Sequence, residues 1–206
     1  MNIILDLDGT LIDAKRRLFT LFCDLTKQTL LAIDDYWELK RAMYDNSYIL
    51  KNYFSYSEAE IGAFNRKWLD QIEESNYLRL DTMFPFTIDV LDKLLQQDIN
   101  LLMITARQFK PNTLQEINRF AIAKFFSAIF VTEGHKTKEE LLRSSGLEFH
   151  SEDLLVGDTG IDIQTGKSLN VRTFAVLSGF RNRSMQLKYR PDFIADDMRN
   201  IVEVLK

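Results

Sequence analysis

The chain has 206 residues, a formal net charge of −4 and an apolar fraction of 46%, values typical of a globular protein. Positive and negative side chains are interspersed, so no basic stripe indicates a nucleic-acid surface and no polybasic segment indicates a membrane surface. No apolar stretch approaches the roughly 20 residues of a membrane helix, and the single cysteine, Cys23, excludes an internal disulfide. We therefore expect a cytoplasmic monomer or homodimer without a nucleic-acid or membrane partner.

The first ten residues combine a short apolar run with two carboxylates. Residues 3–5 show no polar alternation, which predicts a strand buried on both faces, as in a parallel sheet. Asp6 and Asp8 follow directly, and Gly9 permits a tight turn away from the strand. Open α/β sheets place ligands at the carboxyl ends of their strands, so both acids could converge on one reacting centre. Taken alone, residues 6–9, with the pattern Asp-x-Asp-Gly, would fit an ordinary turn equally well.

A long helical stretch follows this turn. Apolar residues recur at helical spacing across 14–31, and helix-start signals stand at 34–35 and 57–60. No strand pattern interrupts 14–80. We therefore expect an α/β fold with two domains: a doubly wound parallel, Rossmann-like core formed by 1–13 and 81–206, and an inserted α-helical cap formed by 14–80.

Beyond residue 80, short apolar strands alternate with helices, the pattern of a parallel doubly wound sheet. Strands are expected at 101–105, 128–131, 154–156, 171–177 and 193–195. Helices are expected after Pro85, from Pro111, after Thr137, after Gly160 and from about 201 onward. A loop rich in Arg and Ser is expected between the last two strands.

Three of the expected strands end in polar residues. Asp6 and Asp8 end the first, the run 105–107 ends the second, and the run 157–162 ends the third. A lysine stands where the intervening helix begins. Because all carboxyl ends lie on one side of a parallel sheet, these groups can meet in space. Each piece alone is ordinary turn or cap chemistry, but their joint occurrence favours a functional site.

The run Asp6-Leu7-Asp8-Gly9-Thr10-Leu11 resembles the opening motif of the haloacid dehalogenase-like hydrolase superfamily, and the polar runs match its four motifs in order, from Asn2 to about Val176. The resemblance implies a phosphomonoester hydrolase that uses Mg²⁺ and an aspartyl-phosphate intermediate to act on a small phosphorylated metabolite. It implies that Asp6 is the nucleophile and Asp8 the general acid and base. Thr105 and a lysine would bind the transferring phosphoryl group.

The same resemblance implies a metal site and further phosphate contacts. Asp6, the Asp8 carbonyl and Asp158 would hold Mg²⁺, with Asp162 as an outer residue of that site or a simple first-turn helix acid. Thr10 would support Asp8. The remaining expected contacts of the phosphate group are Leu7, Thr10, Ala106 and Arg107. Arg107 stands where many relatives have asparagine, so it either adds a positive group near the phosphate or merely starts a helix.

Two lysines compete for the third motif. Thr137 and Glu140 form a plausible capping box that would point Lys138, in the first helical turn, at the neighbouring strand ends. Lys138 is therefore favoured, with Lys136 as the alternative.

The insertion resembles the α-helical cap of phosphoglycolate phosphatase-like and β-phosphoglucomutase-like members, where a lid excludes water from the site. Most of its aromatic residues are expected to form the cap's own core. The candidates for touching the leaving group are Arg41, Tyr44, Asn46 and Lys51.

The sequence leaves two alternatives to a phosphatase: a sugar-phosphate mutase and a non-catalytic phosphate-binding module. Asp8 argues against the dehalogenase and phosphonate-cleaving branches, which usually lack a second acid at this place, although Lys40 or Lys51 could act as a Schiff-base lysine. A sugar-phosphate mutase would keep both acids and a similar cap. A phosphate-binding or regulatory module without catalysis would not need both, so Asp6 and Asp8 together favour an enzyme.

Overall fold

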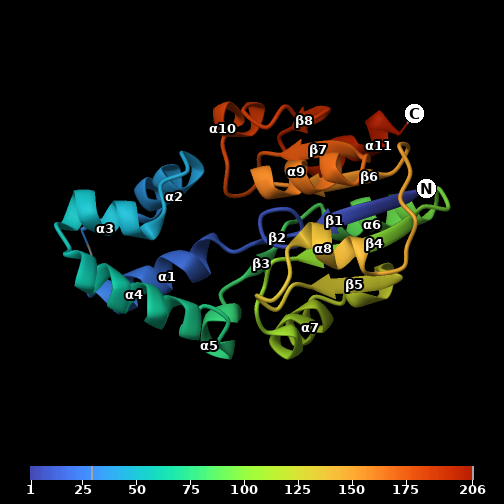
Figure 1. Cartoon of the computed structure of the whole chain (residues 1–206). Coiled ribbons are helices and arrows are strands. Elements are labelled where there is room, and N and C mark those ends of the chain that lie inside the picture. Colours follow the sequence, from blue (N-terminus) through green and yellow to red (C-terminus); the bar gives the residue numbers. More distant parts are fainter. Residues whose placement is uncertain (29, 206) are drawn as a thin grey trace.

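The computed structural model describes residues 1–28 and 30–205. Six strands form one parallel sheet in the order β5-β4-β1-β6-β7-β8, with helices on both faces (Figure 1). The strands are β1 Asn2–Asp6, β4 Asn100–Thr105, β5 Ala128–Val131, β6 Leu154–Gly157, β7 Arg172–Val176 and β8 Phe193–Ala195. The expected doubly wound α/β fold is confirmed, and each of the six expected strands is present within a residue or two of its expected bounds.

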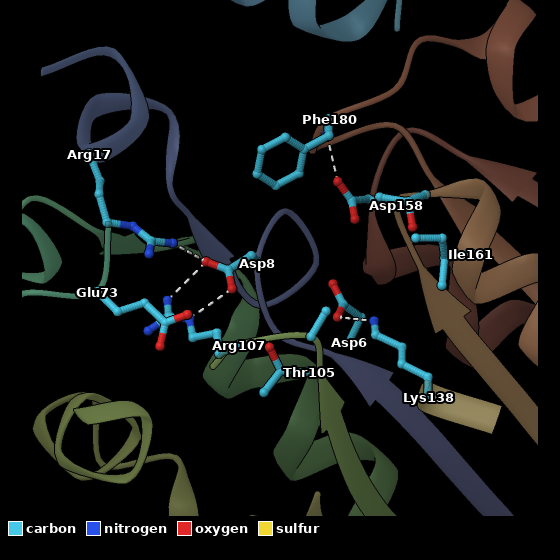
Figure 2. Close-up of a pocket in the computed structure, with 12 residues that line it drawn as sticks. Asp6, Asp8, Arg17, Glu73, Thr105, Arg107, Lys138, Asp158, Ile161 and Phe180 are labelled. Atoms are coloured by element: carbon cyan, nitrogen blue, oxygen red, sulfur yellow. Dashed lines mark hydrogen bonds and ion pairs between the residues drawn. The ribbon is translucent and has the colours of Figure 1, made fainter. Parts of the chain in front are cut away.

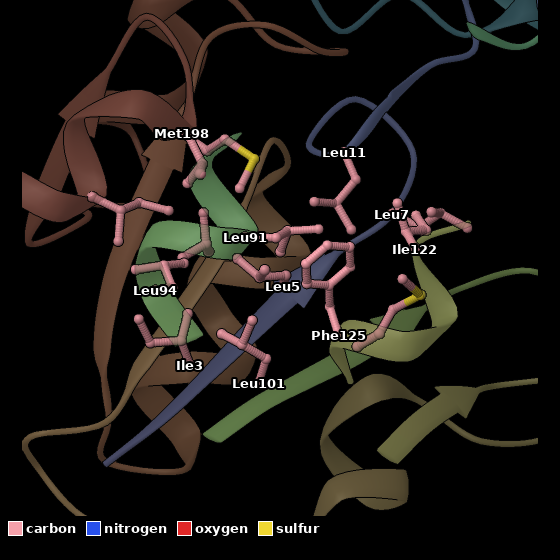
Figure 3. Packing of buried hydrophobic residues seen from close by; sticks show 14 of the residues in the cluster. Ile3, Leu5, Leu7, Leu11, Leu91, Leu94, Leu101, Ile122, Phe125 and Met198 are labelled. Atoms are coloured by element: carbon pink, nitrogen blue, oxygen red, sulfur yellow. The ribbon is translucent and has the colours of Figure 1, made fainter. Parts of the chain in front are cut away.

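Alternate residues of β1 face opposite sides of the sheet and build two apolar layers. Ile3 and Leu5 lie in one cluster with residues of α6 Thr87–Leu95, α7 Lys110–Arg119 and α11 Ile201–Val204 (Figure 3). Ile4 lies in the other, which includes Leu142 of α8 Lys138–Arg143 and residues flanking α9 Gly160–Ser168. β1 is thus buried on both faces, as its apolar run predicts.

We expect Leu5→Ala to destabilise the protein strongly, because Leu5 is fully buried in the centre of the sheet. Deleting this much of a packed side chain typically costs about 2–5 kcal/mol of unfolding free energy. Chemical denaturation of wild type and variant measures the difference. The matched control is Leu69→Ala, since Leu69 is 57% exposed and should change stability little. Equal losses in both variants would contradict the packing described for β1.

Five of the described helices lie between β2 Ile12–Asp13 and β3 Thr82–Met83 and form a body of their own beside the sheet (Figure 1). They are α1 Lys15–Thr26, α2 Ile33–Arg41, α3 Asn46–Phe54, α4 Glu58–Gln71 and α5 Ser75–Leu78. A separate apolar cluster joins them, with Phe22, Tyr36, Ile49 and Phe64 among its buried members. The division into 1–13 with 81–206 and 14–80 stays a prediction, and this separate cluster is compatible with it.

The first helix is shorter than its apolar spacing suggests. α1 ends at Thr26, where Lys27 takes a left-handed conformation (φ 57°), and Leu30 is 85% exposed. Thr29, within the span expected to be helical, lies outside the described residues. Ser57 caps α4 as expected: its hydroxyl accepts the Glu60 amide, and the Glu60 carboxylate accepts the Ser57 amide.

Two features are absent from the expectations. A two-stranded antiparallel ribbon pairs β2 Ile12–Asp13 with β3 Thr82–Met83 at the point where the chain leaves and rejoins the sheet domain. The Arg- and Ser-rich segment, expected as a loop, contains the short helix α10 Arg183–Leu187, whose amino end Asn182 caps. Both are too short to produce a hydrophobic period in the sequence. Among the described residues, no helix is long and apolar enough to cross a membrane.

Candidate active site

The carboxyl ends of β1, β4 and β6 surround a cavity of about 230 Å³ beside the helical body (Figure 2). Asp6 ends β1, Thr105 ends β4, and Asp158 follows β6. The structure therefore brings together residues that lie more than 150 positions apart in the chain. The residues that line the cavity are Asp6, Asp8, Arg17, Glu73, Thr105, Ala106, Arg107, Lys138, Asp158, Thr159, Ile161 and Phe180.

Lys138 joins two of the expected acids. Its Nζ lies 2.5 Å from Asp6 Oδ1 and 2.6 Å from Asp162 Oδ1, and all three side chains are buried. Lys136 instead donates to Ser144 Oγ on the surface, 3.0 Å away. The capping box of Thr137 and Glu140 explains the difference, because it starts α8 where the first-turn lysine points toward the strand ends. Of the two candidates, only Lys138 lies at this site.

Asp162 makes two kinds of contact, one at the start of a helix and one with Lys138. Its Oδ2 accepts the amide and hydroxyl of Thr159 at the start of α9, at 3.0 and 2.7 Å, while its Oδ1 accepts Lys138. Asp162 therefore caps a helix and belongs to the buried charge cluster.

Three buried carboxylates form a group that fits a divalent cation. Oxygens of Asp6, Asp158 and Asp162 lie within 4.8 Å of one another, and Asp158 Oδ1 is buried without a hydrogen-bond partner. Burial, followed by the charges of Asp6 and Asp162, raises the pKa of Asp158 well above its ordinary value. Since Lys138 is the one ammonium of residues 1–28 and 30–205 that is bonded within this group, an oxygen-seeking cation such as Mg²⁺ would offset the remaining negative charge.

The charges of Lys138 and Asp6 depend on their partners. Burial alone would lower the pKa of Lys138, but the carboxylates of Asp162 and Asp6 raise it above its ordinary value. Burial raises the pKa of Asp6 to about 7 against the opposing charge of Lys138. Lys138 is thus a firmly charged partner for Asp6.

Asp158 is held by a loop that sequence reasoning missed. The Phe180 amide donates to Asp158 Oδ2 at 2.5 Å, and a Cβ on Gly179 would lie only 1.9 Å from the same oxygen. A Cβ on Gly9, whose φ is +84°, would lie 2.2 Å from that oxygen. Both glycines are therefore required for the backbone to approach this carboxylate. The ring of Phe180 packs on Trp37 of α2, with ring centroids 5.2 Å apart.

Asp8 lies on the other side of the cavity from the Asp6 and Lys138 pair (Figure 2). Its Oδ1 accepts Arg17 Nη2 at 2.5 Å and Arg107 Nη2 at 2.9 Å, and its Oδ2 accepts Arg107 Nε at 2.8 Å. Burial would raise the pKa of Asp8, but the guanidinium groups of Arg107 and Arg17 hold it well below its ordinary value. Asp8 is therefore a carboxylate in this arrangement.

The expected phosphate contacts Leu7, Thr10 and Arg107 lie in different surroundings. Thr10 does not support Asp8, because its hydroxyl is buried without a hydrogen-bond partner and the two arginines bind the carboxylate instead. Leu7 packs its side chain in the main apolar cluster, and neither it nor Thr10 lines the cavity. Arg107 does not start a helix: it is buried, borders the cavity and precedes α7 by three residues.

The four expected leaving-group contacts in the cap lie outside this cavity. Arg41 donates to the Leu177 carbonyl, and Asn46 accepts the Tyr36 hydroxyl. Tyr44 stacks on Tyr48, and Lys51 pairs with Glu58 on the surface. Lys51 is thereby engaged elsewhere, and Lys40 donates to Asn46 rather than bordering the cavity. The helical body reaches the cavity through Arg17 and Glu73 instead.

Known proteins resemble this chain in sequence and in fold. A parallel α/β sheet with a carboxylate and lysine cluster at its strand ends is an arrangement suited to hydrolytic enzymes. The sequence profile of haloacid dehalogenase-like hydrolases matches residues 3–176, and the chain belongs to this family. It is an enzyme of that family, a hydrolase.

Two curated relatives and one solved structure illustrate the similarity. Pyrophosphatase PpaX of Oceanobacillus iheyensis is 26% identical, over 99% of this chain and 96% of its own length. A phosphoglycolate phosphatase of Aliivibrio fischeri is also 26% identical, over 98% and 95%. The fold matches a haloacid dehalogenase-like family hydrolase of Streptococcus pneumoniae with a TM-score of 0.78 at 21% identity, covering 100% of this chain and 98% of that one.

Proposed function

We propose that the protein is a Mg²⁺-dependent phosphatase that hydrolyses a small phosphorylated metabolite through an aspartyl-phosphate. The observation that carries this proposal is the buried group of Asp6, Lys138 and Asp158 at the strand ends, facing Asp8 across one cavity. The relatives named above, a pyrophosphatase and a phosphoglycolate phosphatase, support the same reaction class.

In the first step, an Asp6 oxygen attacks phosphorus, and the bond to the leaving oxygen breaks as that oxygen takes a proton from Asp8, the general acid of this step. In the second step, water attacks the same phosphorus, the bond to Asp6 breaks, and Asp8 takes the proton of the water. Lys138 restrains Asp6 and, with the Thr105 hydroxyl at the cavity wall, offers positive charge and a hydrogen bond to phosphoryl oxygens.

The carboxylates of Asp6 and Asp158 and the Asp8 carbonyl would hold Mg²⁺, with Asp162 behind them. When bound, the cation supplies charge stabilisation to the phosphoryl oxygens.

We expect activity toward p-nitrophenyl phosphate to be lost after thorough chelation and restored by Mg²⁺. The physical reason is the excess of buried carboxylates over lysine in the group that would meet an anionic substrate. Phosphate release with EDTA, and then with Mg²⁺ or Ca²⁺ in excess, measures the effect. Undiminished activity in the chelated enzyme would contradict the metal assignment.

The cavity favours a small leaving group. Its volume is about 230 Å³, and Arg17 and Glu73 of the helical body form part of its wall. We further propose a cytoplasmic enzyme whose substrate is a soluble metabolite rather than a phosphoprotein or nucleic acid, since a net charge of −4 gives no attraction for a polyanion.

A screen of phosphorylated metabolites with Mg²⁺ tests the proposal, with released phosphate as the readout. Hexose phosphates, nucleoside monophosphates, pyrophosphate and phosphoglycolate are included. Efficient hydrolysis confined to a phosphopeptide or a DNA end would reject the small-substrate proposal. Isomerisation of a sugar phosphate without phosphate release would identify a mutase instead.

A further inference from the structure

A buried ion-pair network adjoins the cavity on the side of Asp8. We call Arg17, Asp81, Arg107 and Glu116 the hinge network. Arg17 Nε lies 3.0 Å from Asp81 Oδ1, Arg107 Nη2 lies 3.1 Å from Asp81 Oδ2, and Arg107 Nη1 pairs with Glu116. None of the four side chains is more than 4% exposed. The ion pairs with Asp81 and Glu116 therefore hold both guanidinium groups in place where they bind Asp8.

The network lies where the chain crosses between the sheet and the helical body. Arg17 is in the first turn of α1, shortly after β2, and Asp81 directly precedes β3. Arg107 follows β4, and Glu116 is on α7. The outgoing and the returning crossing each contribute one charge to the support of Asp8. The orientation of the Asp8 carboxylate therefore depends on where the helical body holds Arg17.

Among the described residues, the side chains that bond to the Asp8 carboxylate are the two arginines, Arg17 and Arg107. Oδ1 accepts two bonds, one from each arginine, and Oδ2 accepts a single bond from Arg107 Nε. A guanidinium group cannot accept a proton, and a carboxylate offers about four lone-pair positions. At least one position therefore stays open, and Oδ2, with the single bond, is the less occupied oxygen. This geometry presents Asp8 as a hydrogen-bond acceptor.

We propose that Arg17 and Arg107 are positioning residues that hold Asp8 as the base for the second half of the reaction, and that Arg17 makes this step depend on the helical body. The proposal rests on the function proposed above. In this step the oxygen of water bonds to phosphorus, the bond from phosphorus to Asp6 breaks, and the electron pair returns to Asp6. The proton of the water passes to Asp8 Oδ2.

Arginine suits this task better than lysine. One planar guanidinium of Arg17 reaches Asp8 through Nη2 and Asp81 through Nε, and it donates to the Ile72 carbonyl through Nη1 at 3.2 Å. A lysine ammonium is a single point and cannot occupy three such directions with fixed geometry. The Arg17→Lys variant therefore keeps the charge of the network but loosens the orientation of Asp8.

The test follows the phospho-enzyme with p-nitrophenyl phosphate, whose leaving group needs little help from an acid. In Arg17→Ala we expect acid-quenched phospho-enzyme to decay at least about tenfold more slowly, less than the roughly 100- to 10,000-fold typical of a whole acid or base. Both kcat and KM should fall, while kcat/KM, which reports the first step, stays within about threefold of wild type. The phospho-enzyme of Arg17→Lys should decay at a rate between those of wild type and Arg17→Ala.

Arg119→Ala is the matched control. Arg119 bonds to Glu116 and to the carbonyls of Leu78 and Asp81, but it contacts neither Asp8 nor the cavity. We expect its phospho-enzyme to decay at the wild-type rate. If Arg17→Ala does not fold, as judged by circular dichroism, Arg17→Lys provides the comparison with Arg119→Ala.

Two results separate failure of this inference from failure of the proposed function. A wild-type enzyme that forms no phospho-enzyme and releases no phosphate would reject the function. An active wild type with folded Arg17 variants that lose kcat/KM as much as kcat, without slower decay of the phospho-enzyme, would overturn the positioning role alone.

Discussion

Asp6→Asn is expected to abolish turnover while leaving the fold intact. An amide cannot attack phosphorus to form the aspartyl-phosphate, so we expect a loss on the order of a thousandfold or more in kcat. Asparagine has nearly the same size as aspartate, and Lys138 keeps its bond to Asp162. The substitution also removes one of three crowded carboxylates, so the free energy of unfolding should not decrease sharply.

Phosphate release, acid-quenched phospho-enzyme and chemical denaturation together measure this result. The matched control is Asp89→Asn, because Asp89 is an exposed acid on α6 whose partner is Lys93. We expect the control to keep wild-type activity. Comparable turnover in a folded Asp6→Asn variant would mean that another residue attacks phosphorus.

The second large effect is expected for Lys138→Ala. Removing the ammonium leaves Asp6 and Asp162 without their buried positive partner and removes a donor for phosphoryl oxygens. Loss of one such electrostatic contact typically lowers kcat about 100- to 1,000-fold. Breaking a buried ion pair on one side typically costs about 3–5 kcal/mol of unfolding free energy.

Lys136→Ala serves as the paired comparison, since Lys136 lies two residues earlier and its ammonium donates to Ser144 Oγ rather than to an acid of the cavity. It should retain activity and stability. Lys138→Arg, which keeps the charge, allows the assay if Lys138→Ala does not fold. Inactivation by Lys136→Ala with an active Lys138→Ala enzyme would transfer the role to Lys136.

The sheet and the shared location of Asp6, Thr105, Lys138 and Asp158 were predictable because they follow from a simple geometric rule. Buried strands give unbroken apolar runs, and the carboxyl ends of parallel strands meet at one edge. Polar residues directly after such runs must therefore gather there, however far apart they stand in the sequence. The capping box at Thr137 likewise identified Lys138 through local chemistry alone.

The hinge network was not predicted, although two of its members left a trace in the sequence. Arg17 falls on the apolar side of α1 beside Leu18 and Leu21, and Glu116 stands next to Ile117 on the buried side of α7. A charge at a helix position that should be apolar indicates a buried partner, but the helical pattern does not say which one. Asp81 leaves no such signal, because its partners come from distant segments.

The orientation of Asp8 could not be predicted either. The sequence places this acid near the cavity, but the direction of its carboxylate depends on Arg17 and Arg107, which come from different segments. The support expected from Thr10 is not seen: its hydroxyl is buried without a hydrogen-bond partner among the described residues, and two arginines bind Asp8.

The ribbon of β2 and β3 makes the helical body an exchangeable module. Ile12 pairs with Met83 and Asp13 with Thr82, so the chain departs and returns through adjacent positions of one antiparallel pair. A tight two-residue hairpin turn can close such a pair. Excising the segment between them would then leave the sheet's connectivity unchanged, and an unrelated insert with closely spaced ends could be grafted in its place. The same sheet could thus carry inserts of different shape while Asp6 and Asp158 stay where they are, whereas Asp8 would lose its bond to Arg17.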